Sequence, residues 1–77
     1  MEDREFTTRL ARLRIGEKIA SIREKKGISQ RQLAELTGIH HINIHKIEHG
    51  QINLTIDKLT IIADALSCRV DVIKGRG

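Results

Sequence analysis

The chain of 77 residues contains no proline, tryptophan or tyrosine, and only one phenylalanine and one cysteine. A single cysteine, Cys68, excludes an internal disulfide and a cysteine-based zinc cluster. A single aromatic residue, Phe6, excludes the stacked rings by which single-strand nucleic-acid binders hold bases, and it requires an aliphatic core. A domain this small buries only about 60% of its unfolded surface. We therefore expect a second subunit to supply part of the stability.

The sequence also lacks the run of about 20 apolar residues that a membrane span needs, and it lacks the charge order of a signal peptide. Together with a free cysteine, these absences favour the cytoplasm and no membrane partner. The content of 39% hydrophobic and 31% charged residues is typical of a folded chain. A formal charge of +4 favours a polyanionic partner. We expect residues 1–77 to form one domain.

Apolar residues recur at helical spacing along almost the whole chain, which predicts four helices. Two short helices separated by a few residues around a glycine describe a helix-turn-helix. The start of the second helix is predicted by a capping-box pair, and its end by a glycine suited to a left-handed turn. The first predicted helix carries Ile15, Ile19 and Ile22 and stops at Gly27. The second lies between Ser29, whose capping partner is Gln32, and Gly38. The third carries Ile44 and Ile47 and ends at Gly50, and the fourth runs from a Thr55 cap to Leu66.

The apolar spacing in residues 1–14 predicts that this N-terminal segment is a helical extension. Phe6, Leu10 and Leu13 have helical spacing, but their stripe lies about 180° around the helix from the stripe of the first core helix. Either the chain bends near Gly16, or the N-terminal stripe meets something outside the core.

We expect the C-terminal segment, residues 67–77, to form a strand or a short helix followed by a tail. Cys68, Val70 and Val72 alternate with the residues between them, and this β-branched alternation favours the strand. A lone strand needs a partner, and its copy in a homodimer would provide one.

The residues from Ile15 to Ile73 resemble the DNA-binding domain of the Xre/Cro/phage-repressor family. The resemblance rests on the spacing Ser29-Gln30-(x)2-Leu33-Ala34-(x)3-Gly38-Ile39-(x)4-Ile44-(x)2-Ile47-Glu48-(x)-Gly50. It implies an all-α, lambda-repressor-like helix-turn-helix domain of four to five helices with its core over 15–66. It also implies a structural pair, Arg23 with Glu48, that bridges the first and third helices.

The third predicted helix turns donors, a cation and an apolar side chain away from the core, which is what reading a major groove requires. By resemblance, the base-reading positions are His40, His41, Ile42 and Lys46. In the family, the residue matching Gln30 contacts a DNA phosphate, and a helix N-terminus adds backbone donors there. Weaker candidates for phosphate contact are Ser29, Arg31, His49, Gln51 and Asn53.

A metal site and an enzyme active site are the two other kinds of site that these residues could form. His41, His45 and His49 recur every four residues, and such pairs can chelate a transition metal. No acidic or cysteine ligand lies at a fitting local spacing, so we predict neither a metal nor a cofactor. The sequence contains no nucleophile–base–orienter set and no glycine-rich phosphate loop, which predicts that the protein is not an enzyme.

These patterns predict a sequence-specific regulator of transcription that binds double-stranded DNA as a homodimer and, by family habit, represses. Its half-sites would lie about one helical turn (~34 Å) apart. One alternative is an antitoxin that binds a partner toxin through the Phe6–Leu13 stripe and regulates its own promoter. Another is a controller of a restriction-modification system.

Overall fold

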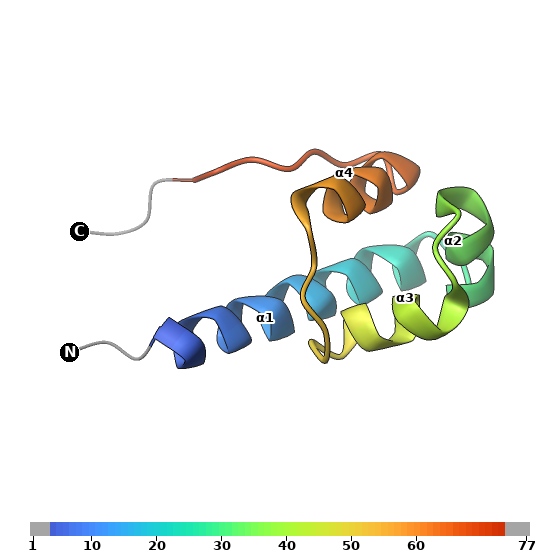
Figure 1. Ribbon diagram of the computed structural model, residues 1–77. Helices are drawn as coiled ribbons and strands as arrows, with labels where there is room; N and C mark the ends of the chain where they lie inside the picture. Colours follow the sequence, from blue (N-terminus) through green and yellow to red (C-terminus); the bar gives the residue numbers. More distant parts are fainter. Residues whose placement is uncertain (1–3, 74–77) are drawn as a thin grey trace.

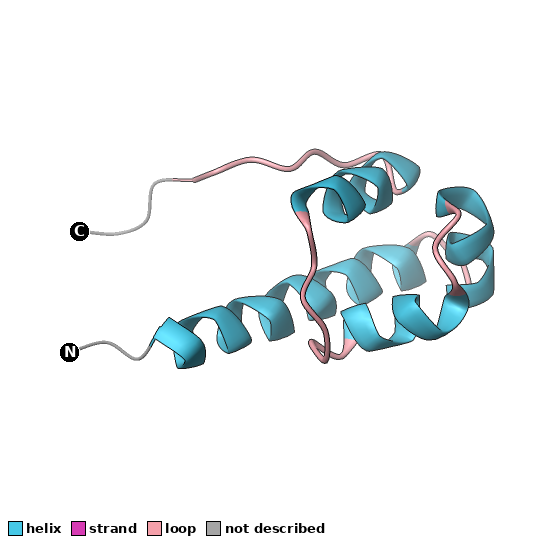
Figure 2. Cartoon of the chain, viewed as in Figure 1, coloured by secondary structure: helices cyan, strands magenta, loops and turns pink. Residues whose placement is uncertain are grey.

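Four helices account for most of the computed structural model, which describes residues 4–73 (Figure 1). They are α1 (Arg4–Lys25), α2 (Gln30–Thr37), α3 (His41–Glu48) and α4 (Ile56–Ala65). Helix α3 packs along α1, and α2 packs against both α3 and α4. Loops and turns make up the rest of the described chain (Figure 2). The predicted all-α, helix-turn-helix fold is confirmed.

Local hydrogen bonds that the sequence predicted define both ends of α2. Ser29 Oγ accepts the backbone N–H of Gln32 at 3.0 Å, and Gln32 Oε1 accepts the N–H of Ser29 at 2.7 Å. This reciprocal capping box starts α2. Gly38 ends it with a left-handed φ of 75°, and its N–H donates to the carbonyl of Ala34 at 2.8 Å. Both ends of α2 are therefore set by residues close to them in the sequence.

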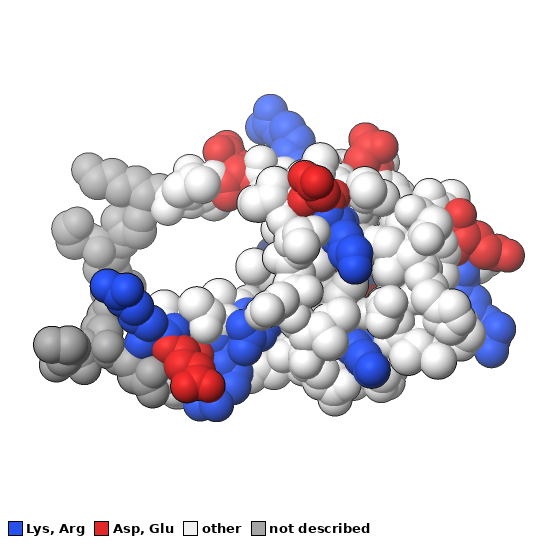
Figure 3. All heavy atoms as spheres, viewed as in Figure 1, with Lys and Arg blue, Asp and Glu red and all other residues white. Residues whose placement is uncertain are grey.

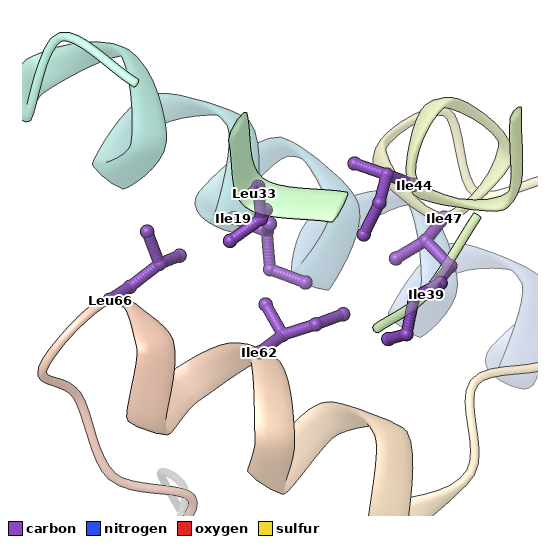
Figure 4. Packing of buried hydrophobic residues seen from close by; sticks show 7 residues of the cluster. All are labelled: Ile19, Leu33, Ile39, Ile44, Ile47, Ile62 and Leu66. Atoms are coloured by element: carbon purple, nitrogen blue, oxygen red, sulfur yellow. The ribbon is translucent and has the colours of Figure 1, made fainter. Parts of the chain in front are cut away.

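The core is aliphatic, as the shortage of aromatic residues required. Leu33, Ile44 and Ile62 are fully buried at its centre and come from three different helices. Because Ile44 and Ile47 of α3 face this core, the other side of α3 faces outward. The buried cluster shown in Figure 4 consists of Ile19, Leu33, Ile39, Ile44, Ile47, Ile62 and Leu66.

Two glycines let the backbones of α1 and the end of α3 touch. A Cβ added to Gly16 would lie 2.6 Å from the carbonyl oxygen of Glu48 and still closer to that of Ile47. A Cβ added to Gly50 would lie 2.9 Å from the Cα of Leu13. The predicted alternative of a bend near Gly16 is wrong, because α1 runs unbroken through it. Gly16 serves the close approach of α3 instead.

Of the residues in the two end stripes, Cys68 packs against the core and the others lie outside it. On α1, Phe6 and Leu13 remain 53% and 41% exposed. Residues 68–73 form neither the short helix nor the strand considered for them, and they run as an irregular segment past α4 (Figure 1). The strand does not form within the single chain because a strand needs a second strand for its hydrogen bonds.

Replacing Gly16 with alanine tests the backbone contact between α1 and α3. Helix propensity alone favours alanine over glycine by about 1 kcal/mol. We expect the steric clash to win and the variant to lose about 1–3 kcal/mol of unfolding free energy. Glu17→Ala, at the exposed neighbouring position, should stay within about 0.5 kcal/mol of the parent. Chemical denaturation measures both, and a Gly16→Ala variant as stable as the parent would contradict the contact.

Candidate nucleic-acid interface

A buried carboxylate joins three helices behind the exposed face of α3. Glu48 Oε2 accepts from Arg23 Nε at 2.6 Å, and Glu48 Oε1 accepts from Arg23 Nη2 at 3.0 Å. The same Oε1 also accepts from Gln30 Nε2 at 2.9 Å. Arg23 Nη1 donates to the carbonyl of Ile28 at 2.7 Å. The bridge that the resemblance implied between Arg23 and Glu48 is present, and it extends to α2 through Gln30.

The bridge stabilises the charged form of Arg23. Arg23 and Glu48 are 9% and 6% exposed, so each would carry a large desolvation penalty alone. The hydrogen bond to Glu48 raises the pKa of Arg23 above its ordinary value and outweighs the opposing effect of burial. The two parallel hydrogen bonds are the strong, charge-assisted kind. The bridge therefore holds α3 in one orientation relative to α1 and α2.

The N-terminus of α3 is capped by a histidine ring. His40 Nδ1 accepts the backbone N–H of Ile42 at 3.2 Å. Because Nδ1 accepts, the neutral ring carries its proton on Nε2 and keeps one donor free for a ligand. The ring of His40 also stacks on that of His41, with centroids 4.6 Å apart. Two of the four predicted base-reading side chains are thus ordered against each other at the start of the helix.

His41 lies beside a cation as well as beside His40. Partial burial lowers the pKa of His41 below its ordinary value, and the nearby charges of Arg31 and His40 lower it further. At neutral pH the ring is therefore uncharged and offers one donor and one acceptor. Arg31, His40 and His41 line one open hollow of about 460 Å³ between α2 and α3. The structure thus places a predicted phosphate contact next to two predicted base readers.

The other two base-reading candidates are exposed on α3. Ile42 is 51% exposed, and Lys46 is exposed on the same helix. In the view of Figure 3, the surface over α3 carries few Lys, Arg, Asp or Glu side chains. Contacts from this face would therefore come chiefly from imidazole rings, one isoleucine and one lysine.

A second hollow, of about 600 Å³, brings Gln30 and His49 together. Gln30 is half-buried, and its amide group is already fixed by the hydrogen bond to Glu48. His49 Nδ1 donates to the carbonyl of His45 at 2.9 Å, and the two rings lie 4.2 Å apart. Three carboxylates, those of Glu17, Glu24 and Glu48, also line the hollow, and they oppose the binding of a phosphate within it.

The remaining phosphate candidates sit at two separate places. Ser29 is exposed at the start of α2, where its hydroxyl oxygen is used for capping. Gln51 and Asn53 are exposed after the end of α3. Asn53 Oδ1 accepts from Arg12 Nη1 at 3.1 Å, which ties this loop to α1. The sequence offered no signal for Arg12, because 41 residues separate the two partners.

Among residues 4–73, no group of three or more His, Cys, Asp and Glu side chains is arranged to hold a metal ion. No helix of this described region combines the length and apolar character needed to cross a bilayer.

Comparison with known proteins places this geometry in a family. A family model described as helix-turn-helix matches residues 19–73. The chain belongs to the Xre/Cro-like helix-turn-helix family. The match covers the capping box, the α2–α3 turn, the Glu48 bridge and the exposed face of α3.

Relatives of this helix-turn-helix protein include named regulators. It is 39% identical over 57 residues to an uncharacterized HTH-type transcriptional regulator of Rickettsia prowazekii, covering 74% of this chain and 44% of that protein. It is 38% identical over 56 residues to control protein C.SmaI of Serratia marcescens, covering 73% and 67%. The chain spans less than half the length of the Rickettsia regulators that it matches.

A solved structure shares the fold. The restriction-modification controller protein C.AhdI from Aeromonas hydrophila superposes on this helix-turn-helix chain with a TM-score of 0.75 at 28% identity. The superposition covers 78% of this chain and 91% of C.AhdI.

Glu48→Ala tests the bridge behind α3. The substitution leaves Arg23 buried without its partner, so we expect a loss of about 3–5 kcal/mol. That loss should lower the melting temperature by more than about 10 °C. The matched control is Glu24→Ala, which removes an exposed carboxylate 3.8 Å from the same arginine and should change stability by less than about 1 kcal/mol. Equal melting temperatures for the two variants would show that the buried ion pair with Glu48 contributes no more to stability than the exposed one with Glu24.

Proposed function

We propose that this chain is a sequence-specific regulator of transcription that binds double-stranded DNA and reads the major groove with α3. One observation carries the proposal. The outer face of α3 presents His40, His41, Ile42 and Lys46, while its inner face is locked by the Glu48 bridge. An ordered donor surface on a rigid helix is what base readout requires, because hydrogen bonds to base edges depend on fixed geometry.

Each exposed side chain on α3 has a chemical counterpart in the groove. Lys46 can donate to the O6 and N7 acceptors of guanine, and Ile42 can contact a thymine methyl group. The free Nε2–H of His40 is a further donor. Arg31 beside His41 and Gln30 at the start of α2 supply cationic and amide donors for the flanking phosphates. Phosphate contacts of this kind set the register without choosing a sequence.

The proposed protein acts as a homodimer and represses by occupying a promoter. A short chain with a single reading helix contacts few base pairs, and doubling the site through a two-fold axis multiplies its selectivity. The proposed half-sites lie about one helical turn (~34 Å) apart. No catalytic step is part of the proposal.

A second candidate, control of a restriction-modification system, is favoured by the similarity to C.SmaI and C.AhdI. This role uses the same face of α3 and differs only in the promoter that is bound. A methyltransferase gene beside this chain's gene, with selective binding to the DNA between them, would support it. The antitoxin alternative rests on the exposed Phe6 and Leu13, and co-purification of a second chain would support that one.

Two substitutions separate base contacts from phosphate contacts. Bound fragments are first selected from random duplexes and sequenced, which defines the preferred site. Lys46→Ala should then cost about 1–3 kcal/mol on that site and relax the preference at one base position. Gln30→Ala should weaken binding evenly across sequences. Lys58→Ala, which removes the same charge from α4, should keep the preference unchanged. If Lys46→Ala and Gln30→Ala weaken all duplexes alike, the assignment of Lys46 to a base is wrong.

The affinity should depend on pH through His41. Its pKa is lowered in the free chain, and nearby phosphates raise the pKa of a histidine because they favour its charged form. Binding then takes up a proton between the two pKa values, so affinity rises as pH falls. We expect tighter binding at pH 6 than at pH 7.5 at constant salt, and a smaller rise in His41→Asn. An affinity that stays constant across this range would contradict a position of His41 in the groove, within the electrostatic field of the phosphates.

A further inference from the structure

The irregular segment after α4, residues 68–73, leaves part of its backbone unpaired within the described chain. Cys68 N–H donates to the carbonyl of Ala63 at 2.7 Å, and Val72 N–H donates to Asp71 Oδ1 at 2.8 Å. Within the described chain, no hydrogen bond engages the backbone N–H groups of Arg69 and Asp71. Val72 and Ile73 are 95% and 85% exposed. An exposed apolar segment with free ladder donors is a template for pairing with another strand.

This segment borders an apolar groove. The groove measures about 370 Å³ and lies between α1, α4 and the segment itself. Its walls include Ile15 and Ile22 of α1, Leu59 and Leu66 near α4, and Val70. Ile15 and Val70 are 37% and 38% exposed, so the groove is open to solvent beside residues 68–73.

We propose that the occupant is a second copy of the chain, whose residues 68–72 pair antiparallel with the same residues of the first copy, with Val70 on the two-fold axis. This inference deepens the proposed function by naming the surface where two copies meet, and it rests on that function for the expectation of a dimer. Charge complementarity selects the register. In it, Val70 faces Val70 of the other copy, Cys68 faces Val72, and Arg69 faces Asp71.

Neighbouring registers fail on charge or polarity. A two-fold axis at Asp71 places the two copies of Asp71 directly opposite each other. An axis at Arg69 places the two copies of Arg69 directly opposite each other. Directly opposed like charges destabilise a strand pair. An axis that falls between two residues sets charged side chains opposite apolar ones.

The existing hydrogen bonds fit the same register. Antiparallel pairs alternate between hydrogen-bonded and non-hydrogen-bonded positions. If Val70 occupies a non-hydrogen-bonded position, the ladder uses the N–H groups of Arg69 and Asp71, which are free. Cys68 and Val72 then fall at non-hydrogen-bonded positions, and their N–H groups are the two already committed within the chain.

The groove supplies what a two-stranded ribbon lacks. Such a ribbon is at best marginally stable in water on its own. In the proposed dimer its apolar face carries Cys68, Val70 and Val72 from each copy. Cys68 and Val70 already line the groove beside α1 and α4, and Val72 is exposed. Dimer formation then removes apolar surface from water on both sides of the axis.

Disulfide trapping tests the register. In a Cys68→Ala background, Val70→Cys sets two thiols directly opposite, about 4.5 Å apart at Cα, which a disulfide can span. Asp71→Cys in the same background sets its thiols on a diagonal of about 7–8 Å, which a disulfide does not span. We expect a covalent dimer on a non-reducing gel for Val70→Cys and little for Asp71→Cys. Preferential cross-linking of Asp71→Cys, or no cross-linking of Val70→Cys, would overturn the proposal.

A charge exchange tests the pairing without cysteine. Arg69→Asp sets aspartates opposite each other twice per dimer and should raise the dimer dissociation constant about tenfold in sedimentation equilibrium. The double variant Arg69→Asp/Asp71→Arg restores both ion pairs and should restore dimerisation. Failure of the double variant to recover would overturn the register.

DNA binding is measured separately on the same proteins. A parent chain that stays monomeric and still binds its selected duplex overturns this inference and the proposed homodimer, and it leaves the proposed base readout by α3 standing. A Val70-centred dimer that binds no duplex with preference supports this inference and overturns the proposed function.

Discussion

The carboxylate of Glu48 is the point at which α1, α2 and α3 are held together. Its two oxygens accept three hydrogen bonds, two from Arg23 and one from Gln30. A buried ion pair adds little net stability relative to apolar packing, but it is costly to break and demands one geometry. That demand matters here because α3 has only eight residues and an exposed outer face. Gln30 links the same bridge to the start of α2. The proposed phosphate contact at Gln30 and the proposed base-reading helix α3 are therefore both held by the carboxylate of Glu48.

Close backbone packing complements the bridge. Gly16 lets the carbonyls at the end of α3 rest against α1, and Gly50 lets the following turn rest on Leu13. At the opposite end, the cap formed by His40 and the stacked ring of His41 order the first turn of α3. Helix α3 is thus fixed at both ends and beneath, while Ile42 and Lys46 stay exposed. A surface of this kind loses little conformational entropy on binding, which favours selective recognition.

Local patterns predicted most of the fold, and long-range contacts were beyond them. The capping box at Ser29 and the left-handed Gly38 depend on a few neighbouring residues, so the sequence located them. The core followed from helical periodicity. The continuity of α1 through Gly16 could not be predicted, because it depends on carbonyls of α3 that lie 31 and 32 residues away along the chain. The contact between Arg12 and Asn53 left no local signal either. The segment 68–73 forms no strand within one chain, because its alternation has no partner there.

Chemical-shift mapping of the labelled protein against its selected duplex tests the central claim most directly. The account predicts that the largest backbone amide changes fall on His40 to Lys46 and on Gln30, with little change along the outer face of α4. Large changes confined to α4 or to the N-terminal half of α1, with the amides of α3 unmoved, would contradict it.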